Sequence, residues 1–104
     1  MKIKFKSGKL LKIFENRKKL EMAYGINQAQ KIVQRINELV SAESLHDIRC
    51  LPSTRLHALT GNLKNYFSID IIHPYRLLIM PNNGDRKDLK TITDIEIIDI
   101  KDTH

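Results

Sequence analysis

One stretch of the chain, residues 55–76, gathers most of the side chains that could act on a phosphate group. It contains two arginines, two histidines, two tyrosines and a lysine. Arginine offers a phosphate two parallel hydrogen-bond donors and stays charged. Histidine titrates near neutral pH and can serve as an acid or a base. The residue types therefore indicate binding and cleavage of phosphodiesters.

Cleavage of RNA without a metal ion needs few groups of this kind. A base takes the proton of a ribose 2′-OH, and the oxygen then attacks the adjacent phosphorus. Cations stabilise the transition state, and an acid protonates the leaving 5′-oxygen. His57 and His104, with Arg55 and Arg76, would supply these groups. Asp102 could orient a histidine or take a proton itself.

Each of these residues also has a structural interpretation. Arg55 could pair with an acidic neighbour, and His57 could simply pack on a sheet face. His104 ends the chain, where fraying is usual. Arg76 is the sharpest signal, because a charge in an apolar strand is costly unless it is paired or faces a polar site. The pattern alone leaves both interpretations open.

Composition narrows the class of protein. The 104 residues favour one domain, residues 1–104, and 41% of them are hydrophobic, which is enough for a core. The chain has 18 Lys plus Arg against 12 Asp plus Glu, a formal charge of +6. This charge favours a polyanion as partner, although a merely basic protein is the alternative.

No cofactor, metal site or membrane span is expected. Cys50 is the only cysteine, which suits a reducing cytoplasm, and it has only His46 near it as a possible second metal ligand. No apolar run approaches the ~20 residues that a membrane span needs. We therefore expect a cytoplasmic protein.

Hydrophobic periodicity predicts a strand and two helices in the first half of the chain. Residues 1–6 alternate like a half-buried strand. A helix follows from a cap at Ser7 to a stop at Gly25, and a second runs from Asn27 to about Ser41. Residues 42–54 show no regular pattern and are expected to be an irregular connection.

Four strands are predicted in the second half, separated by turns and polar loops. They are residues 55–59, 66–71 and 75–80 and a strand within 90–100, with loops at 60–65 and 81–88 and a turn at His73-Pro74. The alternation slips between Ile97 and Ile98, which predicts a β-bulge or a bend. The order β-α-α-β-β-β-β predicts an α+β fold with a helical hairpin on one face of a mainly antiparallel sheet. The opposite face would present Arg55 and His57, together with Arg76 and the C-terminal tail.

The ordered motifs resemble one known family. Residues 55–61, Arg-Leu-His-Ala-Leu-Thr-Gly, then Tyr66-Phe67-Ser68-Ile69 and Tyr75-Arg76-Leu77, look like the RLHxLxG … YSI … YRL run of HigB-type toxins. These are the plasmid-maintenance killer proteins of the RelE/ParE superfamily. The closing Asp102-Thr103-His104 is similar to their C-terminal Asp-Tyr-His, with threonine in place of the usual tyrosine. Threonine can neither stack on a base nor donate a proton well, so the tail departs from the family pattern here.

The resemblance implies a toxin of a bacterial type II toxin–antitoxin system. Such toxins cleave mRNA in the A site of the 70S ribosome without a metal ion. A HigA-type helix-turn-helix antitoxin neutralises them, and they reach operator DNA only through that antitoxin. The implied catalytic residues are His57, Arg76, Asp102 and His104, and the implied RNA-binding residues are Arg55, Lys64 and Tyr66.

Two other functions remain open on the same fold. A ParE-like toxin would poison gyrase by binding alone, and a degenerate toxin would act mainly as an antitoxin partner and co-repressor. The set of His57, Asp102 and His104 favours the nuclease, because a protein that only binds needs no acid–base groups. Thr103 is the single hint of a degenerate toxin.

Overall fold

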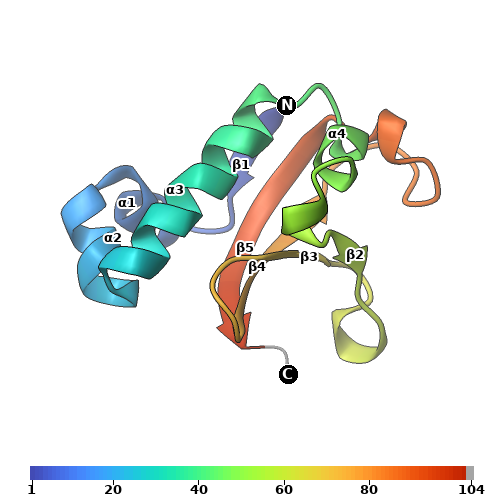
Figure 1. The fold of residues 1–104 in the computed structure, drawn as a ribbon. Coiled ribbons are helices and arrows are strands. Elements are labelled where there is room, and N and C mark those ends of the chain that lie inside the picture. Colours follow the sequence, from blue (N-terminus) through green and yellow to red (C-terminus); the bar gives the residue numbers. More distant parts are fainter. Residues whose placement is uncertain (103–104) are drawn as a thin grey trace.

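A five-stranded sheet with the strand order β1–β5–β4–β3–β2 is the frame of the computed structural model, which describes residues 1–102 (Figure 1). The strands are β1 (Lys2–Phe5), β2 (His57–Ala58), β3 (Phe67–Asp70), β4 (Tyr75–Pro81) and β5 (Asp94–Asp102). The edge strand β1 runs parallel to β5, and the other neighbours are antiparallel. The predicted mainly antiparallel sheet is confirmed.

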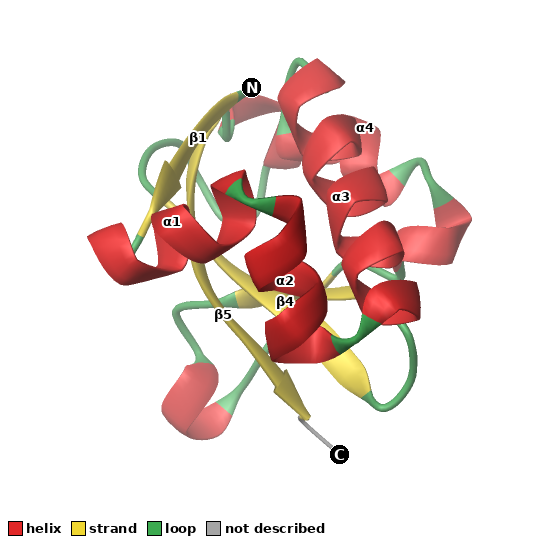
Figure 2. Cartoon of the chain, turned by 90° about the vertical axis from the view of Figure 1, so that its left-hand side faces the viewer, coloured by secondary structure: helices red, strands yellow, loops and turns green. Residues whose placement is uncertain are grey.

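Helices lie against one face of this sheet, as Figure 2 shows for the side that carries α1, α2 and α3. The helices are α1 (Gly8–Glu15), α2 (Arg17–Tyr24), α3 (Ile26–Ser41) and α4 (Leu45–Arg49). Short 3-10 turns occupy Pro52–Thr54, Gly61–Leu63 and Leu89–Thr91. Within residues 1–102, none of the helices has the length and apolar character to cross a bilayer. The predicted α+β class is confirmed.

The single helix predicted between Ser7 and Gly25 is wrong, because Asn16 divides it. Asn16 has an extended backbone, with φ −117° and ψ 109°. Its backbone N–H donates to the carbonyl of Ile13, and its side-chain oxygen accepts from the N–H of Lys19. One asparagine therefore ends α1 and caps α2. Helical periodicity continues across the break and conceals it.

The segment 42–54, expected to be irregular, contains α4 and a 3-10 turn. Leu45 and Ile48 of α4 are both buried, and their spacing of three residues puts them on one face of this short helix. The strand predicted at 55–59 is shorter than expected, because only His57 and Ala58 pair with β3. Arg55 instead ends the 3-10 turn in a left-handed conformation.

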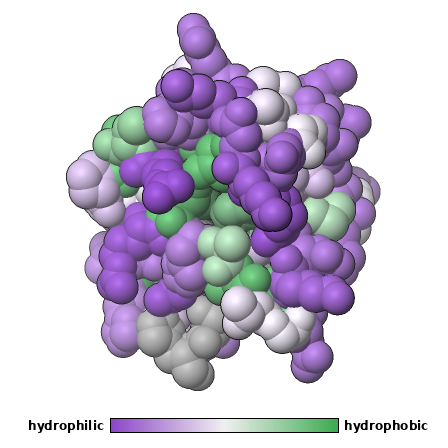
Figure 3. All heavy atoms as spheres, turned by 90° about the vertical axis from the view of Figure 1, so that its right-hand side faces the viewer, coloured by the Kyte–Doolittle hydropathy of each residue, from purple (hydrophilic) through white to green (hydrophobic). Residues whose placement is uncertain are grey.

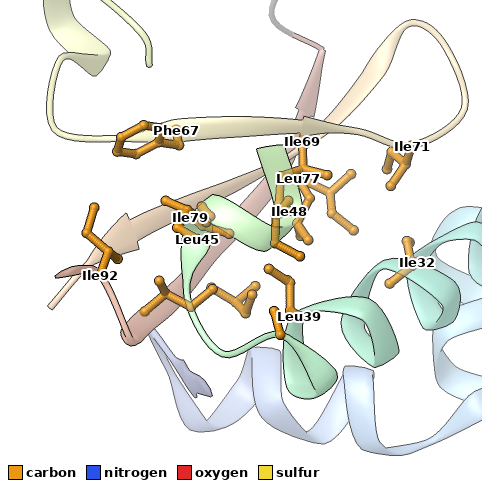
Figure 4. Close-up of a cluster of buried hydrophobic side chains, with 14 of the residues drawn as sticks. Ile32, Leu39, Leu45, Ile48, Phe67, Ile69, Ile71, Leu77, Ile79 and Ile92 are labelled. Atoms are coloured by element: carbon orange, nitrogen blue, oxygen red, sulfur yellow. The ribbon is translucent and has the colours of Figure 1, made fainter. Parts of the chain in front are cut away.

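The core lies between the sheet and the helices α3 and α4 (Figure 4). Ile32 and Leu39 of α3 face Ile69, Leu77 and the other apolar side chains of the strands. All four of these side chains have negligible exposure. Because alternate strand residues point to opposite faces, this packing leaves the remaining strand residues on the open face of the sheet.

The predicted irregularity in the last strand is a bulge at Ile98. Ile79 pairs with Ile97 and Leu78 with Asp99, so β5 has one residue more than β4 at this point. The extra residue lets Ile97 and Ile100 both join the core although they are three positions apart. The bulge therefore sets which face the end of β5 presents.

Two neighbouring residues of α3 test this account of the core. Leu39 is fully buried, whereas Val40 is 55% exposed. Leu39→Ala should lower the free energy of unfolding by about 2–5 kcal/mol, because it leaves a cavity. Val40→Ala should change it by less than about 0.5 kcal/mol. Urea denaturation followed by circular dichroism measures both, and equal effects would place the core elsewhere.

Candidate functional site

Strand pairing collects polar side chains on the open face of the sheet. Asp70 of β3 lies opposite Arg76 of β4, which lies opposite Lys101 of β5. One step along, His57 of β2 lies opposite Ser68 of β3. Strand alternation puts all of these residues on the face that the helices leave uncovered. We call His57, Ser68, Asp70, Arg76 and Arg55 the open-face cluster.

His57 contacts the cluster through both ring nitrogens. Its Nε2 lies 3.2 Å from Nη1 of Arg76, and its Nδ1 lies 3.2 Å from the carbonyl oxygen of Arg55. The Ser68 hydroxyl lies 3.4 Å from Nδ1. Arginine can only donate, so this geometry assigns the lone pair to Nε2 and the proton to Nδ1. The tautomer places a basic nitrogen beside a guanidinium group.

Asp70 lies between the two arginines. Its Oδ1 is 3.4 Å from Nε of Arg76, and its Oδ2 is 3.6 Å from Nη1 of Arg55. The side chain of Arg76 is 13% exposed and that of Arg55 is 71% exposed. The carboxylate compensates the cost of holding the largely buried Arg76 cation away from water. Arg76 thus both has an acidic partner and faces a polar site.

Arg55 reaches the cluster because its backbone takes an unusual conformation. With φ 45° and ψ 44° it is left-handed, which costs a non-glycine residue about 1–2 kcal/mol. This turn directs its carbonyl to His57 and allows its side chain to reach Asp70. The buried Thr54 next to it anchors the turn, since its hydroxyl lies 3.0 Å from the Ile48 carbonyl oxygen.

Arg35 of α3 joins the helix layer to both segments of the site. Its side chain is only 3% exposed. Nε donates to the carbonyl of Asp70 at 2.7 Å, and Nη2 donates to the carbonyl of Ser53 at 2.9 Å. Nη1 contacts Oε1 of Glu38 at 2.8 Å. One buried guanidinium therefore holds the strand that carries Asp70 and the turn that carries Arg55.

The structure brings Arg55, His57 and Arg76 together, but not as the sequence analysis expected. Arg55 and His57 were expected to point together from one strand, and that expectation is wrong because Arg55 precedes the strand. Lys64 is exposed at the end of the 3-10 turn between β2 and β3. Tyr66 is half-buried just before β3, two positions from Ser68 and therefore on the same side of the chain.

Of the two site residues predicted in the C-terminal tail, the structure describes Asp102 but not His104. Asp102 ends β5 and pairs with Tyr75, whereas its neighbour Lys101 pairs with Arg76. By alternation Asp102 shares its side of the strand with Tyr75, and Lys101 shares the side of Arg76. His104 lies outside the described residues.

Two residues that organise the cluster, Asp70 and Arg35, were not predicted as site residues. Asp70 and Arg76 are equally far from His73, so counting outward from the predicted His73-Pro74 turn would have paired them. Arg35 lies three residues after Ile32 and four before Leu39, in the middle of the buried stripe of α3. A charged residue inside a buried stripe was a usable signal.

Other features of the molecule lie apart from the cluster. A pocket of about 690 Å³ lies on the helical side between α2, α3 and α4 and is lined by none of the predicted site residues. His46 and Cys50 approach to 3.6 Å, and in the part of the chain described here no three His, Cys, Asp or Glu side chains converge as metal ligands. Burial, with a smaller contribution from the Asp99 carboxylate, raises the pKa of Tyr24 on α2.

One protein-family model matches nearly the whole chain. The model of the HigB-like toxins, described as the RelE-like toxin of the type II toxin–antitoxin system HigB, matches residues 3–97. The matched range contains the complete open-face cluster and ends before Asp102. No curated protein matches the sequence.

The anchoring role of Arg35 can be tested against an exposed arginine. Arg35→Ala should lower the free energy of unfolding by about 2–4 kcal/mol, because charged hydrogen bonds to three acceptors are lost. Arg17→Ala, which breaks the exposed 3.0 Å pair with Glu21, should cost less than about 1 kcal/mol. Urea denaturation gives both values.

Hydrogen exchange separates local anchoring from general instability. Amides of residues 52–57 should exchange faster in Arg35→Ala than in Arg17→Ala. Unchanged protection there, or equal loss of stability in the two variants, would contradict the role assigned to Arg35.

Proposed function

The chain belongs to the HigB-like toxins, the RelE-like toxins of type II toxin–antitoxin systems, and from this premise we propose that it is a ribosome-dependent mRNA endonuclease. Membership in the family implies an antitoxin partner. The proposed activity inhibits translation by cutting mRNA in the ribosomal A site, using the side chains of the protein without a metal ion. A cytoplasmic location follows from that target.

The contact between Nε2 of His57 and the guanidinium of Arg76 carries the proposal. It places a group that can accept a proton beside a group that binds a phosphate and remains charged. Arg55 adds a second guanidinium, 3.6 Å from Asp70. Asp70 is therefore the common partner of Arg55 and Arg76. A phosphate entering the cluster would engage both arginines by competing with Asp70 for Arg55 and with His57 for Arg76.

The cleavage reaction would proceed in two proton transfers. His57 takes the proton of the ribose 2′-OH through Nε2 once Arg76 turns to the scissile phosphate. The 2′-oxygen bonds to phosphorus, the bond to the 5′-oxygen breaks, and the arginines stabilise the added negative charge. His104 would protonate the leaving 5′-oxygen. Asp102, which by alternation lies on the Tyr75 side of β5 and not on the side of Arg76, would act through His104 by orienting it or taking its proton. Lys64 and Tyr66, on the hairpin beside the cluster, would contact flanking phosphates or bases.

The proposed partners are those expected of a HigB-like toxin that cuts mRNA on the ribosome. The formal charge of +6 supports contact with ribosomal RNA and mRNA, both polyanions. The antitoxin is proposed to be a HigA-type helix-turn-helix protein, and the toxin would reach operator DNA only through it.

Translation-dependent cleavage tests this proposal in cells. Primer extension on a reporter mRNA after brief induction should reveal cuts in frame with translation. His57→Ala and Arg76→Ala should each reduce cleavage by about 10²–10⁴-fold, the usual range for losing an acid–base group or a transition-state cation. His46→Ala and Arg17→Ala, which change the same residue types away from the cluster, should cleave normally.

A supercoiling assay on plasmid from the same cultures separates the competing functions. Intact mRNA with gyrase-linked DNA damage would assign the chain to the ParE-like, non-catalytic class. Intact mRNA with normal supercoiling and antitoxin-dependent repression would indicate a degenerate toxin, to which Thr103 is the pointer. Cleavage that persists in both site variants would remove His57 and Arg76 from the mechanism.

Asp70 should oppose RNA binding while it supports catalysis. Asp70→Asn removes the charge that competes with phosphate for Arg55 and Arg76. It should tighten binding of a non-cleavable 2′-fluoro RNA by about fivefold, equivalent to ~1 kcal/mol for a partly exposed pair. Cleavage should nevertheless slow, because Arg76 loses the group that orients it.

Fluorescence anisotropy measures this affinity, and Glu96→Gln is the control. Glu96 is on β5 opposite Met80 and carries the same charge, so its replacement changes net charge equally without touching the cluster. Equal tightening in both variants would reduce the effect to net charge, and weaker binding in Asp70→Asn would contradict the competition.

A further inference from the structure

A groove of about 260 Å³ lies between the loop that joins β4 to β5, helix α4 and strand β2. His57 lines its edge and also contacts Arg76 on the open face. Ala58 and Phe67 point to the helical side instead, so the groove and the open-face cluster lie on the two faces of the sheet at the edge strand β2. The volume of the groove is just below the roughly 300–1,000 Å³ typical of pockets for drug-sized ligands. That size suits one nucleoside rather than an extended ligand.

The rim of the groove is positively charged. Arg49 from α4 and Arg86 and Lys87 from the loop all line it, and all three are exposed. No carboxylate is among its lining residues in the described chain. The loop does contain Asp85 and Asp88, but each accepts hydrogen bonds from backbone N–H groups of the loop itself. The rim therefore attracts an anion.

The floor of the groove is apolar and includes an aromatic ring. Leu56, Phe67 and Leu89 line it, and the guanidinium of Arg86 lies over the Phe67 ring, 4.7 Å from its centroid. Figure 3 shows this side of the molecule, where apolar atoms are visible between hydrophilic groups. A guanidinium plane held by an aromatic ring is a surface on which a base can stack. Cations beside such a surface are typical of single-strand binding.

The loop that supplies two of the cations is held in place by its own hydrogen bonds. The hydroxyl of Thr91 accepts from the N–H of Asp85 at 2.7 Å, and the Asn83 amide donates to the Thr93 hydroxyl at 2.9 Å. Gly84 has φ +76° and packs against the Thr91 carbonyl so closely that a side chain would collide with it. These contacts fix the backbone of the loop, and the Phe67 ring holds the guanidinium of Arg86, before any ligand binds, which reduces the entropy lost on binding.

From these observations we infer that the groove is a second RNA subsite, which binds the nucleotide one step beyond the two that the scissile phosphodiester joins. The base lies on the Arg86–Phe67 stack, and Lys87 and Arg49 bind the adjoining phosphate. The inference rests on the proposed nuclease function. It adds a binding position on the β2 side of His57, opposite the arginines that hold the reacting phosphate.

Graded RNA lengths test the subsite directly. The probes are 2′-fluoro oligoribonucleotides of two and six nucleotides, which lack the attacking hydroxyl and cannot be cut. Arg86→Ala combined with Lys87→Ala should weaken binding of the hexamer about tenfold and leave the dinucleotide nearly unaffected. The slope of log K against log[salt] should become shallower by about 0.7, because the phosphate contact of Lys87 is lost, whereas Arg86 contacts the base.

Two further variants control for charge and for loop structure. Lys12→Ala combined with Lys19→Ala removes the same charge from the α1–α2 side and should retain the affinity and slope of the unmodified protein. Lys87→Ala alone leaves the Arg86–Phe67 contact in place and should change the slope by about 0.7. A double loop variant that binds the hexamer like the unmodified protein would overturn the subsite.

The outcome separates this inference from the proposed function. If Arg76→Ala weakens hexamer binding and the loop variant does not, only the subsite is wrong. If the loop variant weakens binding but mRNA is never cut in cells, the groove binds RNA and the nuclease function fails. If the loop variant binds RNA normally but loses affinity for the antitoxin, the groove serves an acidic protein segment instead, which overturns the inference.

Discussion

The rest of the site depends on the buried guanidinium of Arg35. A charge that is 3% exposed must have its donors satisfied, and Arg35 satisfies them with carbonyls from β3 and from the 3-10 turn before β2, together with Glu38. Those two carbonyls belong to Asp70 and to Ser53, two residues before Arg55. The helix layer thereby sets the distance between the segments that carry the two ends of the Arg55–Asp70 pair. Burying Arg35 costs free energy, and in return its hydrogen bonds fix the positions of the segments that carry Arg55 and Asp70.

Opposed charges keep the open-face cluster organised. Asp70 holds Arg55 and Arg76 near His57, yet it is also the group that a phosphate must compete with. Within the cluster, the arginines and His57 carry the chemistry of the proposed reaction, whereas Asp70 and Arg35 position them. In the groove beside β2 an arginine is also held in place, but there the Phe67 ring, not a carboxylate, orients Arg86. A guanidinium held in that way keeps its full charge available to an anion.

Local patterns predicted the architecture well where periodicity was long or turns were distinct. The α+β class, the antiparallel strands after residue 55 and the bulge near Ile98 all followed from the alternation of side chains. The break at Asn16 escaped because the apolar stripe continues through it, and α4 escaped because five residues hold too few turns to show a period. Both misses concern the helical layer. On the open face, the strand predicted at 55–59 is reduced to His57 and Ala58, and Arg55 precedes it.

The order of residues is enough to predict which face of the sheet each strand residue takes, because alternation along a strand is a local property. It also marks His57 and Arg76 as side chains able to act on a phosphate. The left-handed turn at Arg55, the position of Asp70 between two arginines and the burial of Arg35 beneath them arise from the folded chain as a whole. These contacts join residues up to 35 positions apart, as between Arg35 and Asp70. Such pairs are set by the packing of α3 on the sheet and by the lengths of the turns, neither of which is encoded in the period of any single segment.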